Sequence, residues 1–299
     1  MLSSFCKTKY FWLFNSVKNF LVFFNYRKKS IIAKLIFKLF LIVNNIILNC
    51  LPYAIILVIW QIAVIYLAIP NYILPTPITI FKYIISYNYR EILLINSSVT
   101  ALEAFFGLIL ATLASISLGV IALYNLFFIK VFYKMLLLIQ IIPLMAIAPL
   151  IIIWFGFGIN TKILVVFIIC LFPCLFSFIR GNLNIDKELL TLLKSMGASR
   201  LQIFRLVILP SSCYSLFSGL KIAVTYSVTG AVIAEYMGAE KGLGVYLARA
   251  ISSFDTTSLF VNVFCIVFIT LFFYKIISFI EKLITPWNNK QKELSNDCL

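Results

Sequence analysis

Few side chains in this sequence are of the types that carry out catalysis. The 299 residues include no histidine, which removes the commonest general base and rules out a nucleophile activated by histidine. Cys170 and Cys174 have the spacing of a metal pair, but they lie in an apolar run with Pro173 between them. A structural zinc site needs four converging ligands, so we interpret both as small core side chains. Without a Gly-x-x-x-x-Gly-Lys-Ser/Thr phosphate loop, the sequence predicts no catalysis, bound cofactor or metal site in this chain.

Two carboxylates stand out because they lie in or beside apolar sequence. Glu103 and Glu235 occupy positions where a charge costs about 2–3 kcal/mol or more and usually faces a cavity or a partner. Both are candidates for lining the outer half of a polar path, together with Tyr226 in a cluster of hydroxyl-bearing residues. The alternatives are a helix-packing hydrogen bond for Glu103, a structural role at the mouth for Glu235, and helix packing for Tyr226.

The composition places these residues in a membrane protein. Hydrophobic residues make up 63% of the chain, charged residues 12%, and the mean hydropathy is +1.07. Soluble domains are nearer half apolar and a quarter charged. Apolar runs of about 20 residues span a bilayer as helices. The sequence therefore predicts an all-α, polytopic protein with about six transmembrane helices, near residues 51–69, 97–124, 135–154, 163–179, 213–236 and 258–280.

Pro143 and Pro149 both fall inside the third predicted span. A proline breaks the helical hydrogen-bond ladder, which lipid tolerates only where protein or water satisfies the freed carbonyl groups. We expect either a hinge or cavity wall there, or a static bend that allows close packing.

The basic residues predict the orientation. Of the 25 lysine and arginine residues, all but Lys82, Arg90, Lys162, Lys241 and Arg249 fall on one side if the N-terminus is cytoplasmic. The positive-inside rule then places both termini in the cytoplasm. A net charge of +15 is also typical of nucleic-acid binding, but these charges already lie where the topology rule requires them, so we expect no nucleic acid partner.

The chain divides into three regions. Residues 1–50 form a basic, aromatic extension in which residues 31–48 favour an interfacial helix held at lipid headgroups. The alternative is a further span, which would reverse the N-terminus. Residues 51–285 form the transmembrane domain, with a long cytoplasmic loop at about 182–210, and residues 286–299 form a cytoplasmic tail.

The loop has the signals of two short helices. Asp186 is a candidate N-cap, with Glu188 in the first turn near the positive end of the helix dipole. Leu189, Leu193 and Met196 follow at i, i+4 and i+7 as an apolar stripe, and Gly197 ends the helix.

Ser199 and Gln202 form a capping box for a second helix, and Pro210 marks its exit. A solvated connector is the alternative interpretation. The apolar stripe favours a docking loop instead, because leucine and methionine exposed to water form a costly patch unless a partner covers them.

The same loop resembles that of binding-protein-dependent ABC transporter permeases, whose pattern is E-A-A, three residues, G, nine residues, then I-x-L-P. Gly197, Val207, Leu209 and Pro210 fall at the matching spacings, whereas residues 191–193 (Thr-Leu-Leu) match none of E-A-A. Residues 74–77 (LPTP), 142–158 and 238–244 are similar to segments of the nitrate, sulfonate and taurine branch. The likeness covers residues 51–287.

The resemblance implies a type I ABC importer permease fold and a set of residues that couple to an ATPase. These are Glu188, Leu189, Thr191, Leu192, Leu193, Met196, Gly197, Ala198, Leu209 and Pro210. It also implies an inner-membrane homodimer in lipid that forms the translocation path for a small solute. A periplasmic substrate-binding protein would deliver the solute, and a separate ABC ATPase subunit would use ATP.

Similarities over shorter segments indicate the cargo. Residues 192–199 (LLKSMGAS), 148–158 (APLIIIWFGFG) and 225–244 (TYSVTGAVIAEYMGAEKGLG) are similar to permeases for hydroxymethylpyrimidine-type thiamine precursors. A sulfonate, taurine or nitrate importer is the alternative. An ATPase-independent secondary transporter or channel is the alternative of another class, although such proteins often contain paired repeats and we find no convincing internal repeat in this sequence.

Overall fold

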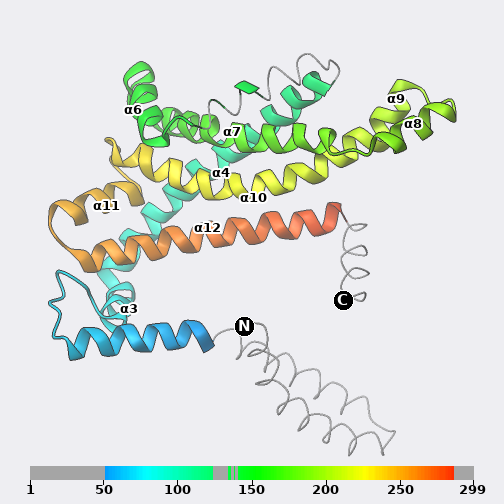
Figure 1. Ribbon diagram of the computed structural model, residues 1–299. Coiled ribbons are helices and arrows are strands. Elements are labelled where there is room, and N and C mark those ends of the chain that lie inside the picture. Colours follow the sequence, from blue (N-terminus) through cyan, green and yellow to red (C-terminus); the bar gives the residue numbers. More distant parts are fainter. Residues whose placement is uncertain (1–50, 124–133, 136–137, 139–140, 286–299) are drawn as a thin grey trace, which may run out of the picture. The chain divides into compact units, whose positions relative to one another are not determined.

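The computed structural model describes residues 51–123, 134–135, 138 and 141–285 (Figure 1). Across these ranges the regular elements are helices, joined by turns and short extended connections. The predictions for residues 1–50 and 286–299 lie outside the described residues.

Within the described ranges, four helices are long and apolar enough to cross a membrane. They are α4 (Tyr87–Leu123), α7 (Ile159–Leu183), the continuous helical stretch Leu201–Tyr236 that contains α10 (Leu209–Tyr236), and α12 (Thr256–Ile284). Shorter apolar helices occupy Leu51–Tyr66, α6 (Leu144–Phe155) and α11 (Leu243–Ser252). The predicted all-α, multi-pass architecture is confirmed, with the four long helices at the second, fourth, fifth and sixth predicted spans.

The third predicted span, residues 135–154, is not one unbroken helix. Ile141 and Ile142 lie in a turn, and α6 begins at Leu144 with Pro143 as its N-cap (φ −63°, ψ 130°). Proline has no N–H to donate and disfavours helical backbone in the residue before it, so the helix starts after it. Only Pro149 lies inside the helix. The prediction that both prolines interrupt a helix was therefore wrong for Pro143.

A short helix, α3 (Pro77–Ile85), precedes α4. Its N-cap is Thr76, whose hydroxyl accepts a hydrogen bond from the Thr79 N–H at 3.2 Å, and Pro77 occupies the first turn, where a missing N–H costs nothing. The LPTP segment is thus a helix start. Tyr83 of α3 donates from its hydroxyl to Oδ2 of Asp255, the N-cap of α12, at 3.1 Å.

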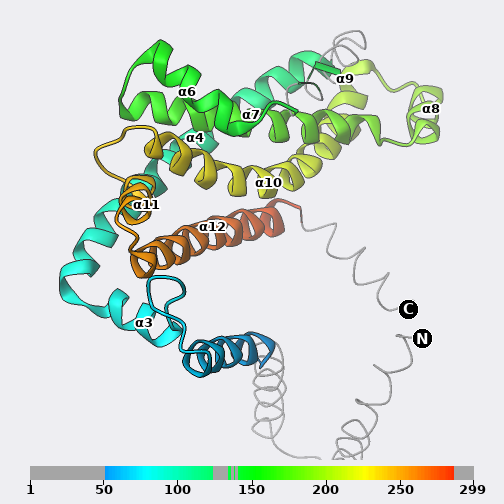
Figure 2. The same ribbon diagram turned by 60° about the vertical axis from the view of Figure 1, so that its left-hand side comes forward.

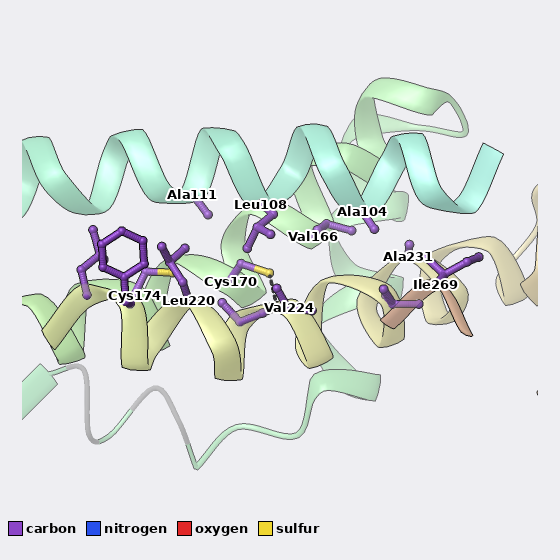
Figure 3. Packing of buried hydrophobic residues seen from close by; sticks show 14 of the residues in the cluster. Ala104, Leu108, Ala111, Val166, Cys170, Cys174, Leu220, Val224, Ala231 and Ile269 are labelled. Carbon is purple, nitrogen blue, oxygen red and sulfur yellow. Dashed lines mark hydrogen bonds between the residues drawn. The ribbon is translucent and has the colours of Figure 1, made fainter. Parts of the chain in front are cut away.

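Three helices, α4, α7 and α10, supply most of the apolar core, and α12 runs beside α10 (Figures 1 and 2). Figure 3 shows Ala104, Leu108 and Ala111 of α4 directed towards α7 and α10. Cys170 and Cys174 are fully buried in this cluster, and the Cys170 thiol donates to the Ala223 carbonyl oxygen at 3.3 Å. The interpretation of both cysteines as core side chains is confirmed.

Glycine allows the two central helices to approach closely. A Cβ atom added at Gly219 of α10 would lie 2.6 Å from the Pro173 carbonyl oxygen of α7, and 2.6 Å from the Ser177 side chain. Small residues at such crossings are the usual means by which membrane helices pack, because lipid supplies no hydrophobic driving force between them.

Candidate functional site

The first helix of the loop, α8 (Lys187–Ser195), begins as its sequence predicts. The Asp186 side chain accepts a hydrogen bond from the Glu188 N–H at 2.9 Å, and Glu188 lies in the first turn. Both acidic residues therefore lie at the positive end of the helix dipole.

Gly197 ends this helix with φ +80°. The Gly197 N–H donates to the Lys194 carbonyl oxygen at 3.0 Å, and the Ala198 N–H donates to the Leu193 carbonyl oxygen at 3.0 Å. This pair of bonds is a Schellman motif, which requires a left-handed residue at the position of Gly197. The predicted helix stop is confirmed.

The Ser199–Gln202 capping box is also confirmed. The Ser199 N–H donates to Gln202 Oε1 at 2.7 Å, and the Gln202 N–H donates to Ser199 Oγ at 3.3 Å. These bonds satisfy donors at the start of α9 (Arg200–Ile203) that have no partner within the helix.

The chain then continues without a break, contrary to the prediction that Pro210 marks the exit of a separate helix. A π-helical turn, η1 (Phe204–Ile208), joins α9 to α10, and the Leu209 N–H donates to the Phe204 carbonyl oxygen. Pro210 lies in the first turn of α10. A proline ring clashes with the carbonyl of the fourth preceding residue in an α-helix, and a widened turn relieves that clash.

The loop presents apolar side chains to its surroundings. Met196 is 75% exposed and Leu192 is 56% exposed, and Leu189 is also exposed, whereas Leu193 is half-buried. Glu188, Thr191, Leu192 and Ser195 border a shallow hollow on α8. Figures 1 and 2 both show α8 and α9 projecting beyond the ends of α7 and α10. The loop is therefore a protruding, capped knob with a partly apolar surface.

A cavity of about 640 Å³ lies against α7 and α10, with the N-terminal part of α6 at its edge. The α7 side contributes Phe172, Pro173, Phe176, Ser177 and Arg180, among other residues, and α10 contributes Ser215, Ser218, Ile222 and Tyr226. The four α10 residues are spaced i, i+3, i+7 and i+11, so they form one face of the helix. Of these, Ser218, Ile222 and Tyr226 are exposed.

This face of α10 carries several exposed polar side chains. Thr225 and Thr229 are exposed beside Tyr226, along a helix that is long and apolar enough to span a membrane. Polar groups in transmembrane helices normally face a partner helix or a water-filled cavity. The exposed hydroxyl groups of this face therefore lie beside the cavity-lining residues of α10.

Glu235 is nearly fully buried near the other end of α10 from the loop. Its Oε1 accepts from the Thr100 hydroxyl at 2.7 Å, and its Oε2 accepts from the Gly244 N–H at 2.7 Å. Thr100 Oγ1 accepts in turn from the Leu243 N–H at 2.9 Å, and Asn96 Oδ1 accepts from the Gly242 N–H at 2.8 Å. The carboxylate therefore fixes the start of α11 to both α4 and α10.

Glu103 completes this buried network. It is fully buried on α4 and forms an ion pair with Lys162 of α7, whose side chain is 13% exposed. The carboxyl groups of Glu103 and Glu235 also interact electrostatically with each other and with Lys162. A buried ion pair removed from water must be well matched, since loss of one partner leaves an uncompensated charge.

The structure thus separates the three residues predicted for the path. Tyr226 lines the cavity, whereas Glu103 and Glu235 lie in the buried network and are not among the cavity-lining residues. Sequence reasoning missed Asn96, Thr100 and Lys162. The spacing of Asn96, Thr100 and Glu103, at i, i+4 and i+7, was an available signal for one polar helix face.

A multi-pass helical domain with a protruding capped loop and a half-open cavity between its central helices is the architecture of a membrane transport subunit. The family model described as "Binding-protein-dependent transport system inner membrane component" matches residues 106–290. The chain belongs to this family, as the loop motif predicted, and it is a permease subunit of an ABC importer.

Relatives agree with the predicted branch. The chain is 29% identical over 239 residues to the formylaminopyrimidine transport permease protein ThiX of Halalkalibacterium halodurans, covering 80% of this chain and 95% of that one. It is 28% identical over 150 residues to the taurine transport system permease protein TauC of Escherichia coli, covering 50% and 54%. An inward-facing structure of the MetNI methionine ABC transporter shares the fold, with a TM-score of 0.56, 18% identity, and coverage of 67% of this chain and 100% of that one.

Proposed function

We propose that this permease pairs with a second identical copy in the membrane and is driven by a separate ABC ATPase subunit. Each α8 knob would sit in a cleft of an ATPase subunit, and closure of the ATPase pair would push the two knobs together. ATP would be bound and hydrolysed by the partner, and this chain would bind no cofactor and catalyse no reaction.

The observation that carries this proposal is the surface of the loop. Leu192 and Met196 are exposed on a knob whose backbone is fixed by an N-cap, a Schellman motif and a capping box. A rigid element with uncovered apolar side chains is suited to transmit a force through a partner that covers them.

The proposed orientation follows from the basic residues. With the loop in the cytoplasm, Arg180, Lys194 and Arg205 lie on the inner side, as the positive-inside rule requires. The N- and C-termini would also be cytoplasmic, in a cell inner membrane. A periplasmic substrate-binding protein would then meet the opposite face and deliver the solute there.

The proposed cargo is a thiamine-precursor pyrimidine. The support is the similarity of residues 192–199 and 225–244 to permeases of that kind, together with a formylaminopyrimidine permease among the relatives. The taurine permease among the relatives keeps a small sulfonate as the second candidate.

Substitution at Met196 tests the coupling. In proteoliposomes that hold the complete importer, we expect Met196→Glu to abolish ATP-dependent uptake of labelled hydroxymethylpyrimidine, because it places a charge in an apolar contact. Met196→Leu is the matched control and retains an apolar side chain of similar volume. Met196 is largely exposed, so both variants should insert and purify normally.

Unchanged uptake by Met196→Glu would contradict coupling through the knob. Uptake that continues in liposomes lacking ATP and the ATPase subunit would instead favour a secondary transporter. Uptake of labelled taurine, with none of the pyrimidine, would leave the coupling intact and replace the cargo.

A further inference from the structure

We propose that the cavity between α7 and α10 is itself a binding site for cargo, and that it selects a flat heteroaromatic solute without positive charge. This inference rests on the proposed importer function and adds a site for the solute within the membrane domain. The permease would therefore take part in selection after the binding protein has released its cargo.

Aromatic side chains give the cavity its first selective feature. Phe172 and Phe176 lie one helical turn apart on α7, and both are only half-buried. Tyr226 of α10 lines the same cavity and is 40% exposed. Aromatic rings favour stacked or edge-to-face contact with a flat heterocycle, whereas a small aliphatic sulfonate has no ring to engage them.

Hydroxyl groups give the second feature. Ser177, Ser215 and Ser218 all line the cavity, and none of these three hydroxyls makes a hydrogen bond to any other described residue. By contrast, Thr229 of the same α10 helix donates to the Thr225 carbonyl oxygen at 2.9 Å. The serine hydroxyls are therefore available to the nitrogen, amino and hydroxyl groups at the edge of a heterocycle.

Charge gives the third feature. Among the described residues that line the cavity, Arg180 is the single charged one, and none of them is acidic. It lies in the last turn of α7, next to the knob. A guanidinium offers five donors and no acceptor, so it favours acceptor-rich or anionic groups and repels a cation. Selection of a heterocycle over a sulfonate therefore depends on the aromatic rings.

The volume is also appropriate. A cavity of about 640 Å³ falls in the range of about 300–1,000 Å³ that is usual for sites of small organic ligands. An apolar wall with a few convergent polar groups is the usual composition of such sites. The cavity therefore combines the size, ring contacts and polar groups that a heteroaromatic cargo needs.

Fluorescence can test binding without transport. The permease–ATPase complex, purified in detergent without the binding protein, would carry Tyr226→Trp, and hydroxymethylpyrimidine would be titrated against it. Stacking of the pyrimidine on the introduced indole should quench its emission saturably. Tyr274→Trp is the matched control, since Tyr274 of α12 is 43% exposed and lies outside the cavity.

We expect saturable quenching with Tyr226→Trp beyond that of the parent protein, none with Tyr274→Trp, and none with taurine as the titrant. Adding Phe176→Leu should weaken the apparent affinity about tenfold, in keeping with the loss of one stacking ring. If that variant does not purify, Phe172→Leu makes the same test from the neighbouring turn.

Absence of quenching in Tyr226→Trp, or equal quenching by taurine, would overturn the inference. Either result would leave the importer function standing, provided that the parent complex still shows ATP-dependent uptake. Failure of the parent complex to take up any solute with ATP would instead refute the importer function, whatever the fluorescence shows.

Discussion

Removal of the Glu235 carboxylate should destabilise the end of the molecule opposite the knob. In Glu235→Ala, the Thr100 hydroxyl and the Gly244 N–H each lose an acceptor at 2.7 Å in a buried site. An orphaned buried donor costs about 1–3 kcal/mol. Loss of both acceptors therefore lowers the free energy of unfolding by about 2–6 kcal/mol. The net decrease is smaller, because the variant no longer has the desolvation cost of a buried carboxylate.

A double-mutant cycle separates this network from simple loss of packing. Thr100→Val removes the same hydroxyl that donates to Glu235 and accepts from the Leu243 N–H. Because the two residues share one hydrogen bond, the loss of unfolding free energy in the double variant should be smaller than the sum of the two single losses, by about 0.5–3 kcal/mol. Glu235→Gln keeps one acceptor oxygen, so its free energy of unfolding should decrease less than that of Glu235→Ala.

The assay is denaturant unfolding of the purified protein in detergent micelles, followed by loss of helical circular dichroism. Lys241→Ala is the control, because Lys241 is exposed in the same turn. Strictly additive losses for Glu235→Ala and Thr100→Val would refute the shared bond. Wild-type stability of Glu235→Ala would refute the idea that this carboxylate holds α11 in place.

Two further substitutions follow from the packing and the charges. Lys162→Met should destabilise the protein by about 3–5 kcal/mol, because it leaves the buried Glu103 carboxylate without its ion-pair partner. Adding Glu103→Gln to this variant should recover much of the lost stability in the same unfolding assay. No recovery would mean that the unpaired charge is not the cause. Gly219→Val should separate α7 from α10, because its Cβ would lie 2.6 Å from the Pro173 carbonyl oxygen. Gly197→Ala meets open space and should cost only about 1–2 kcal/mol, from the left-handed backbone at that position. Equal melting temperatures for these two variants would contradict the close helix contact.

Local signals in the sequence predicted the loop in detail. The caps at Asp186 and Ser199 and the stop at Gly197 depend on residues within a few positions of one another, and the structure shows each of them. The exit at Pro210 was wrong because proline is compatible both with the end of one helix and with the first turn of the next.

Contacts between distant residues could not be predicted in the same way. Glu235 bonds to Thr100 across 135 positions, and the Gly242 N–H bonds to Asn96 across 146. A single sequence shows that Glu103 and Glu235 are unusual but not which groups face them. The sequence predicted Tyr226 as a path residue but not the residues of α7 that face it, because the cavity walls come from helices that are separated by the whole loop.

The knob, the cavity and the Glu235 network are joined by one continuous helical stretch, Leu201–Tyr236. At about 1.5 Å per residue, its 36 residues form a rod roughly 54 Å long. A rod that tilts about its middle moves its two ends in opposite directions, so a push on the knob also displaces the turn held by Glu235. Under the importer function and cargo site proposed above, this stretch would act as a lever with the cargo beside its middle, opening one face of the membrane while it closes the other.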